Sequence, residues 1–183
     1  MTRACRTPQP PHTLHAVLVV AISLVPSAAW SQSPSALPRV RSENASIAEL
    51  IATGVSGSET FRSLVEGING TNGMVYVESG QCGHGVQACL AHSIRLAGPH
   101  RILRVVVSLR RERMELIGAI GHELQHALEV LSDQTITTGP GMFFHLYGMS
   151  MNSTSGRFET TSALQAGNRI ERELRLSTAS ARR

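Results

Sequence analysis

His122 and His126, with three residues between them, are the residues whose types and spacing best suit metal chemistry. On an α-helix they lie one turn apart on the same face, with about 6 Å of rise between them. Both imidazoles can then bind one tetrahedral ion. The intervening Glu123 lies about 100° round the helix from His122, where it can take a proton from water and pass it to a leaving group. The pattern predicts a Zn²⁺ site with His122 and His126 as ligands and Glu123 as the catalytic base.

A catalytic zinc site needs a third protein ligand, with the fourth position left for water. The candidates in the chain are Glu129, Asp133, His145 and Glu159. Glu129 stands seven residues beyond His122, a rise of about 10.5 Å on an unbroken helix, which is too far for one ion to bind both comfortably. Asp133 follows the expected end of the helix and stays a candidate.

Glu159 is the preferred third ligand. On the expected last helix it points the same way as Ala163, Ala166, Ile170 and Leu174, which must face the core. A carboxylate on a buried face is costly unless it is paired or bound to a metal. The alternative is a solvated acid in the first turn of the helix, where the helix dipole favours it. His145 is the second choice and could instead donate to the oxyanion of a transition state; Tyr147 is a weaker candidate for that role.

The elements that must position these side chains follow from hydrophobic periodicity. Short helices are expected at residues 47–52 and 59–68, with Ser58 as the N-cap of the second. Strands are expected at residues 74–78, 90–96 and 102–109, and long helices at residues 111–131 and 158–176. The expected fold class is α+β, with a small antiparallel three-stranded sheet packed against the motif helix and the C-terminal helix.

The first 31 residues are predicted to be a secretory signal peptide. Arg3 and Arg6 precede a short apolar run, and the small-residue pattern around Ala29 and Ser31 suits cleavage before Gln32, with cleavage after Ala29 as the alternative. Residues 32–43 are expected to be a flexible lead-in, and residues 44–183 one catalytic domain. We therefore expect a secreted or periplasmic protein that does not bind membranes after the signal is cleaved.

Cys82 and Cys89 are the two cysteines that remain after that cleavage. An even pair in an exported chain predicts a disulfide that closes a short loop. The net charge of +4 falls to +2 without Arg3 and Arg6, and the other arginines are scattered among few aromatic residues. A nucleic-acid partner usually needs a clustered basic patch or stacking aromatics, so none is expected.

The motif His122-Glu123-x-x-His126, followed 33 residues later by Glu159, resembles the gluzincin branch of zinc metallopeptidases. The resemblance covers about residues 111–175. It implies zinc, a peptide or protein substrate and Glu123 as general base, and an extended peptide can pair with an exposed sheet edge. The alternative is a zincin-like metal-binding or regulatory module without turnover, and a third interpretation is a disulfide-linked domain without metal.

Overall fold

The computed structural model of the chain describes residues 38–83, 85–150 and 158–180. These residues belong to one compact unit, Ala36–Arg183. The expected signal peptide, with its cleavage point, and His84 lie outside the described residues. Within the described ranges, no helix has the length and apolar character needed to cross a membrane.

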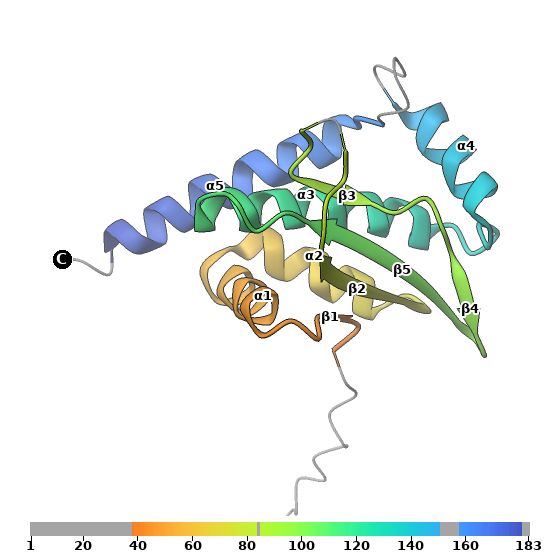
Figure 1. The fold of residues 1–183 in the computed structure, drawn as a ribbon, viewed down its shortest axis with the longest axis horizontal. Coiled ribbons are helices and arrows are strands. Elements are labelled where there is room, and N and C mark those ends of the chain that lie inside the picture. The colour runs from red at the N-terminus through yellow and green to blue at the C-terminus, as the bar shows by residue number, and fades with distance from the viewer. Residues whose placement is uncertain (1–37, 84, 151–157, 181–183) are drawn as a thin grey trace, which may run out of the picture. The chain divides into compact units, whose positions relative to one another are not determined.

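A mixed sheet forms one layer of the unit (Figure 1). Its strands are β1 (Val40–Arg41), β2 (Gly73–Ser79), β3 (Ala88–Leu90), β4 (Arg95–Ala97) and β5 (His100–Val107). The order is β1-β2-β5-β3, and β4 also pairs with β5. β1, β2 and β5 are parallel, whereas β3 and β4 run antiparallel to β5. The α+β class is confirmed, but the expectation of an antiparallel three-stranded sheet was wrong.

The connection between β2 and β5 explains the difference. Residues 80–99 are enough chain to return β5 alongside β2 in the same direction, which a tight turn cannot do. The alternating residues 90–96 do not form one strand, because the pairing with β5 is interrupted between Leu90 and Arg95. Gly98, with φ of 57°, begins the two-residue turn that joins β4 to β5.

Five helices accompany the sheet in the described ranges. They are α1 (Ala45–Gly57), α2 (Glu59–Asn69), α3 (Arg113–Ser132), α4 (Gly139–Met149) and α5 (Thr161–Ser180). The Ser58 hydroxyl accepts a hydrogen bond from the Phe61 N–H, so the expected N-cap is confirmed. The expected lead-in was wrong at its end, since Val40 is buried and pairs with Val75.

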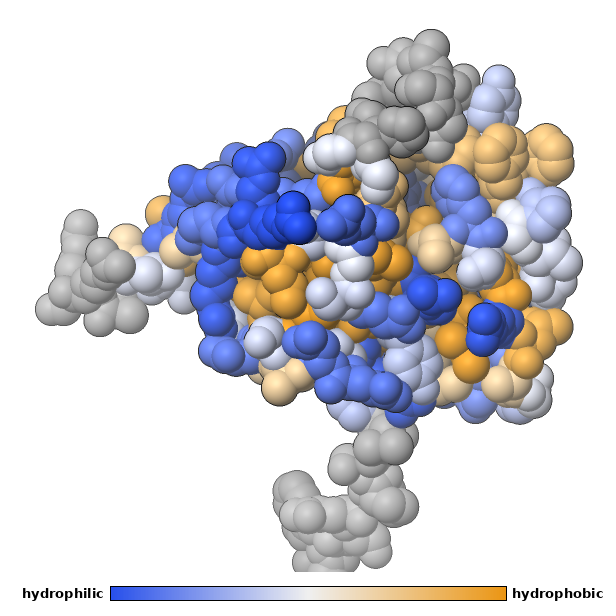
Figure 2. Space-filling model, in the orientation of Figure 1, coloured by the Kyte–Doolittle hydropathy of each residue, from blue (hydrophilic) through white to orange (hydrophobic). Residues whose placement is uncertain are grey.

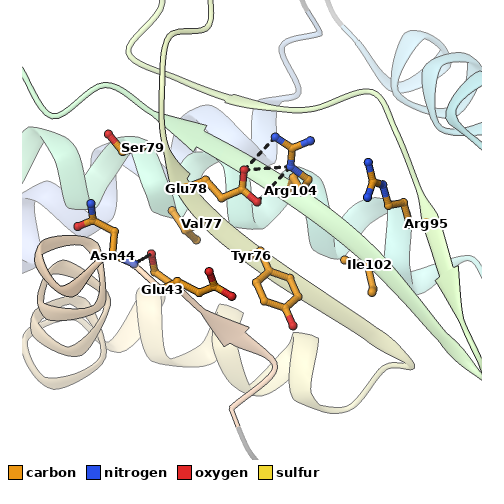
Figure 3. Close-up of a pocket in the computed structure, with 10 residues that line it drawn as sticks. Glu43, Asn44, Tyr76, Val77, Glu78, Ser79, Arg95, Ile102 and Arg104 are labelled. Carbon is orange, nitrogen blue, oxygen red and sulfur yellow. Dashed lines mark hydrogen bonds and ion pairs between the residues drawn. The ribbon is translucent and has the colours of Figure 1, made fainter.

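One face of the sheet packs against α1, α2 and α3. Alternate strand residues are fully buried there, including Val75, Val77, Leu103 and Val105. The opposite face carries polar side chains. A shallow hollow of about 450 Å³ lies on this face, around Tyr76 and the Glu78–Arg104 ion pair (Figure 3).

The pair α3 and α5 lies side by side (Figure 1). Glycines allow their close approach: a Cβ at Gly121 would stand 2.1 Å from Ile170 Cδ1, and one at Gly118 would stand 2.6 Å from Glu171 Cγ. On the other helix, a Cβ at Gly167 would meet the Gly118 carbonyl oxygen at 3.3 Å. The motif helix is therefore held against the last helix at van der Waals distance.

The buried Arg101 fixes the end of α3 to β5. Its guanidinium donates to the carbonyl oxygens of Val130, Leu131, Asp133 and Ile136, and its Nε donates to Asn72. These carbonyls belong to the last turn of the helix and the segment after it, whose acceptors have no partner within the helix. A single side chain thereby satisfies the C-terminus of the helix that carries the motif.

Candidate active site

The three motif residues line one cavity of about 530 Å³, between β3, α3 and the segment that precedes α5. The rings of His122 and His126 have centroids 4.9 Å apart and meet edge to face. Glu123 lies on the same helix and is 8% exposed. The helical spacing thus brings the three side chains to one wall, as the sequence predicted.

Glu159 lies at the same wall. Its Oε2 is 3.6 Å from His122 Nε2, and this oxygen is buried without a hydrogen-bond partner. The Nε2 atom of His126 is also buried without a partner. The expectation that Glu159 lies on the buried face of the last helix was wrong, however, because α5 begins at Thr161 and Glu159 precedes it. The residue reaches His122 from the approach to the helix, not from its buried face.

A chain of hydrogen bonds orients His126. Its Nδ1 lies 3.0 Å from Glu129 Oε2, and the Thr160 hydroxyl donates to Glu129 Oε1 at 2.9 Å. The Ala163 N–H in turn donates to the Thr160 hydroxyl, which caps the start of α5. The far nitrogen of the imidazole is thereby held and Nε2 is left at the cavity, the arrangement common behind metal-binding histidines.

His122 lies against α5. A Cβ at Gly167 would stand 3.4 Å from the His122 Cβ. Burial, and to a smaller extent the neighbouring His126, lowers the pKa of His122 to about 4. A neutral imidazole is the form that can bind a metal.

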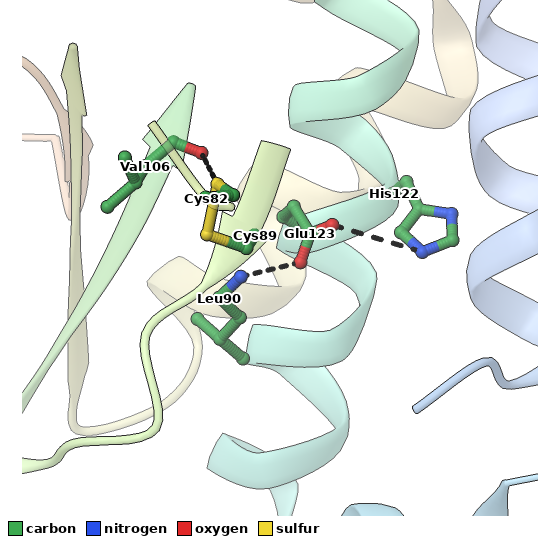
Figure 4. The surroundings of a disulfide bond; sticks show 6 residues. All are labelled: Cys82, Cys89, Leu90, Val106, His122 and Glu123. Carbon is green, nitrogen blue, oxygen red and sulfur yellow. Dashed lines mark hydrogen bonds and ion pairs between the residues drawn. A yellow bond between two sulfur atoms is a disulfide. The ribbon is translucent and has the colours of Figure 1, made fainter. Parts of the chain in front are cut away.

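Glu123 is anchored to the edge of the sheet (Figure 4). The Leu90 N–H donates to its Oε2 at 2.7 Å, and its Oε1 lies 4.0 Å from His122 Nε2. Burial raises the pKa of Glu123 to about 7, against the opposing influences of His126 and the Leu90 hydrogen bond. A carboxyl group with a pKa near neutrality suits proton transfer in both directions.

The other sequence candidates take different places. Asp133 accepts hydrogen bonds from the N–H and hydroxyl of Thr135, beyond the end of α3. His145 lies on α4 near Asp133, and Tyr147 stacks on Phe143. None of the three lines the cavity. Glu129 does not line the cavity either. Its side chain is 6% exposed, and its carboxylate contacts His126 Nδ1.

His92 is a cavity residue that the sequence interpretation missed. It falls in the strand expected at residues 90–96, but it lies outside any strand and is exposed at the cavity, with its ring 5.2 Å from that of Phe158. Burial, and secondarily His126, lowers the pKa of His92. No periodicity could reveal this, because His92 follows β3 in an irregular segment.

The disulfide between Cys82 and Cys89 is confirmed, with Cα atoms 5.8 Å apart. Both cysteines line the cavity, and Cys89 immediately precedes Leu90, the residue that holds Glu123 (Figure 4). The crosslinked loop therefore forms part of the wall beside the motif.

Residues 38–83, 85–150 and 158–180 contain no group of three or more His, Cys, Asp or Glu side chains already arranged to hold a metal ion. Two ligands of a tetrahedral zinc ion stand roughly 3.4 Å apart, given bonds of about 2.0–2.2 Å. The 3.6 Å between His122 Nε2 and Glu159 Oε2 is close to that value. Comparisons with protein-family models, curated proteins and solved structures found no match.

Proposed function

We propose that the chain is a small exported zinc-dependent hydrolase that cleaves peptide bonds. One observation carries the proposal: His122, His126 and Glu159 line one cavity, with His122 Nε2 3.6 Å from Glu159 Oε2, and both His126 Nε2 and Glu159 Oε2 are buried without a hydrogen-bond partner. Buried polar atoms are rarely left unpaired, so such a pair of atoms suggests an absent ligand.

The donor set suits zinc. Two imidazole nitrogens and one carboxylate oxygen are ligands that zinc takes in catalytic sites, with one position left open. Zinc held by His122, His126 and Glu159 would supply a Lewis acid that polarises a carbonyl group and makes water more acidic. The Glu129 carboxylate behind His126 supports this assignment, since a carboxylate in that position raises the basicity of the ligand.

Glu123 is the proposed general base. Its Oε2 is held by the Leu90 N–H, which leaves Oε1 toward His122 and the cavity. It would take a proton from water as the water oxygen attacks the scissile carbonyl carbon. It would then give a proton to the amide nitrogen as the C–N bond breaks, leaving a carboxylate and an amine.

The edge strand β3 offers a place for the substrate backbone. Gln87 accepts a hydrogen bond from Ser108 and Ala91 donates one to Arg104, so the backbone groups of the intervening Ala88 and Leu90 point away from β5. The Leu90 N–H already donates to Glu123, which leaves the Ala88 backbone groups and the Leu90 carbonyl for a further strand. Ala88 and Leu90 line the cavity. An extended peptide could add to this edge as a further strand, next to Glu123.

Export is part of the proposal, and the bonded cysteine pair supports it because such bonds persist in oxidising compartments. The alternative of a metal-binding or regulatory module without turnover predicts zinc without cleavage.

Two measurements test the proposal on protein that begins at Gln32. Metal analysis after zinc loading and desalting should give about one zinc per chain, and a His122→Ala, His126→Ala double variant should lose it. A peptide library should be cleaved by the zinc-loaded protein, and Glu123→Gln should remove cleavage while zinc stays bound. Stoichiometric zinc in the double variant would overturn the site. Zinc without cleavage would favour the module, and cleavage unaffected by Glu123→Gln would exclude the mechanism.

A further inference from the structure

The cavity lining consists of chemically different parts. The carboxylates and the motif imidazoles line one part, and the disulfide loop lines another. A third part, called here the apolar end, is lined by Ala91, His92, Leu146 and Phe158, with the rings of His92 and Phe158 5.2 Å apart. None of these four side chains carries a carboxylate, an ammonium or a guanidinium group. A charged substrate group placed there would lose its hydration without gaining an ion pair.

A cluster of aromatic rings braces this end. The ring of Phe158 meets that of Phe143 edge to face at 4.9 Å, and Phe143 stacks on Tyr147 at 6.1 Å. Phe158 is 8% exposed, so its ring is fixed within the cluster. The rim is formed by His92, whose ring also meets Phe143 at 6.2 Å.

The cluster is not a by-product of an aromatic-rich chain. The protein contains four phenylalanines, and three of them, Phe143, Phe144 and Phe158, stand here. The fourth, Phe61, is buried in the core between the helices. Apolar residues also gather on the surface over α4, where Phe144 is 69% exposed (Figure 2). The aromatic surface therefore continues from the cavity wall to the outside of the molecule.

Phe158, which lines the cavity, directly precedes Glu159, the candidate metal ligand. The backbone of Glu159 is held by hydrogen bonds with the Ser150 hydroxyl, so the short segment has a fixed position. A group that rests on the Phe158 ring therefore lies beside Glu159, the candidate metal ligand.

We propose that this end of the cavity is a specificity subsite for an aromatic or large aliphatic side chain of an extended peptide, with Phe158 and Leu146 as its floor and His92 at its rim. The inference rests on the proposed function, because it names the side chain that the proposed hydrolase selects. Burial of such a side chain should favour it over alanine or aspartate at least tenfold.

Binding can be measured without turnover. The single tryptophan, Trp30, precedes Gln32, so protein that begins at Gln32 has no tryptophan and still contains the whole unit Ala36–Arg183. Fluorescence of a tryptophan-containing peptide then reports binding to the Glu123→Gln variant directly. Matched non-fluorescent peptides with Phe, Leu, Ala or Asp at that position compete for the site, with and without zinc. Cleavage by the unmodified protein is mapped in parallel by mass spectrometry.

We expect Phe and Leu peptides to compete at least tenfold better than Ala and Asp peptides, and to be cleaved with a correspondingly higher kcat/KM. Phe158→Ala should remove the preference, and Leu96→Ala, which changes an exposed apolar side chain on β4 outside the cavity lining, should keep it. If Phe158→Ala does not fold, Phe158→Leu should shift the preference from Phe toward Leu.

The outcomes separate the two proposals. A preference that survives in folded Phe158→Ala or is unchanged in Phe158→Leu overturns the subsite. Cleavage without any side-chain preference overturns it too and leaves the hydrolase standing. Binding with the expected preference but without cleavage supports the subsite and overturns the hydrolase.

Discussion

Glu129 and His126, three residues apart on α3, share a hydrogen bond of 3.0 Å between Oε2 and Nδ1. The carboxylate is almost fully buried and also accepts from Thr160 and Gln125. Its position fixes which imidazole nitrogen faces the cavity. Glu129 is thus a positioning residue for His126, one turn of helix away from the metal ligands proposed here.

Glu129→Gln should weaken zinc affinity by roughly 10- to 100-fold, because an outer hydrogen-bond partner both orients a ligand and raises its basicity. Competition with a zinc-binding dye measures this affinity. Glu49→Gln, a change at an exposed carboxylate on α1, is the control and should leave it unchanged. Equal zinc affinity in Glu129→Gln and the unmodified protein would remove Glu129 from the site.

Glu123 should make the metal-free protein less stable as the pH rises. Its pKa is raised to about 7 by burial, from 4.5 when unfolded. The folded state therefore keeps a proton that the unfolded chain releases between these values. The stabilising contribution is complete below the unfolded pKa and is lost as the pH rises through about 7.

Urea unfolding in the presence of a chelator tests this directly. The free energy of unfolding of Glu123→Gln, relative to the unmodified protein, should rise by on the order of 3 kcal/mol between about pH 4.5 and pH 8. His122, whose pKa is lowered to about 4, contributes stability above its unfolded value that is lost as the pH falls. That contribution is present in both proteins and cancels to first order. A constant difference across the pH range would contradict the prediction.

Gly121→Ala should destabilise the protein by about 1–3 kcal/mol, because the added methyl would overlap Ile170 Cδ1 across the α3–α5 contact. Ile170→Val removes that one carbon. In the Ile170→Val background, Gly121→Ala should cost little, which gives a clear coupling in a double-mutant cycle of unfolding free energies. Gly148→Ala on α4 has open space around it and serves as control. Additive effects of the two changes would show that the helices are not held at this point.

Removal of the Cys82–Cys89 bond should cost on the order of 2–3 kcal/mol, since the closed loop is short. Thermal unfolding of the Cys82→Ala, Cys89→Ala variant measures this loss. We also expect weaker peptide binding at the cavity, because the loop lines the cavity and leads into β3. A variant with lower stability and unchanged peptide affinity would limit the bond to a purely structural role.

Local patterns predicted much of the fold. The motif helix, the Ser58 cap and the β2 strand follow from periodicity and short-range hydrogen bonds, and the structure confirms them. The sheet topology could not be predicted from local patterns, because parallel pairing of β2 with β5 depends on the path of the chain that connects them. The role of Arg101 could not be predicted either, because the carbonyl groups that it binds belong to a helix end some 30 residues later in the chain.

The candidate site was likewise predictable only where it depends on local structure. The positions of His122, Glu123 and His126 relative to one another are a property of one helix. The approach of Glu159 depends on where α5 begins, and boundaries of this kind are set by the Thr160 cap and by packing on α3. Glu129 was excluded as a ligand on distance alone, and only the tertiary contact with Thr160 shows what its carboxylate does.

Assembly of the candidate site depends on the two residues that directly precede α5. Glu159 faces His122, and the adjacent Thr160 holds Glu129, 31 residues earlier in the chain. A nascent chain that has emerged only as far as α4 thus contains the histidine motif without the groups that orient it. Docking of the segment that contains Glu159 and Thr160 brings both groups into place at once. The site should therefore form in a single step near the end of folding, and displacement of α5 should disrupt the whole site.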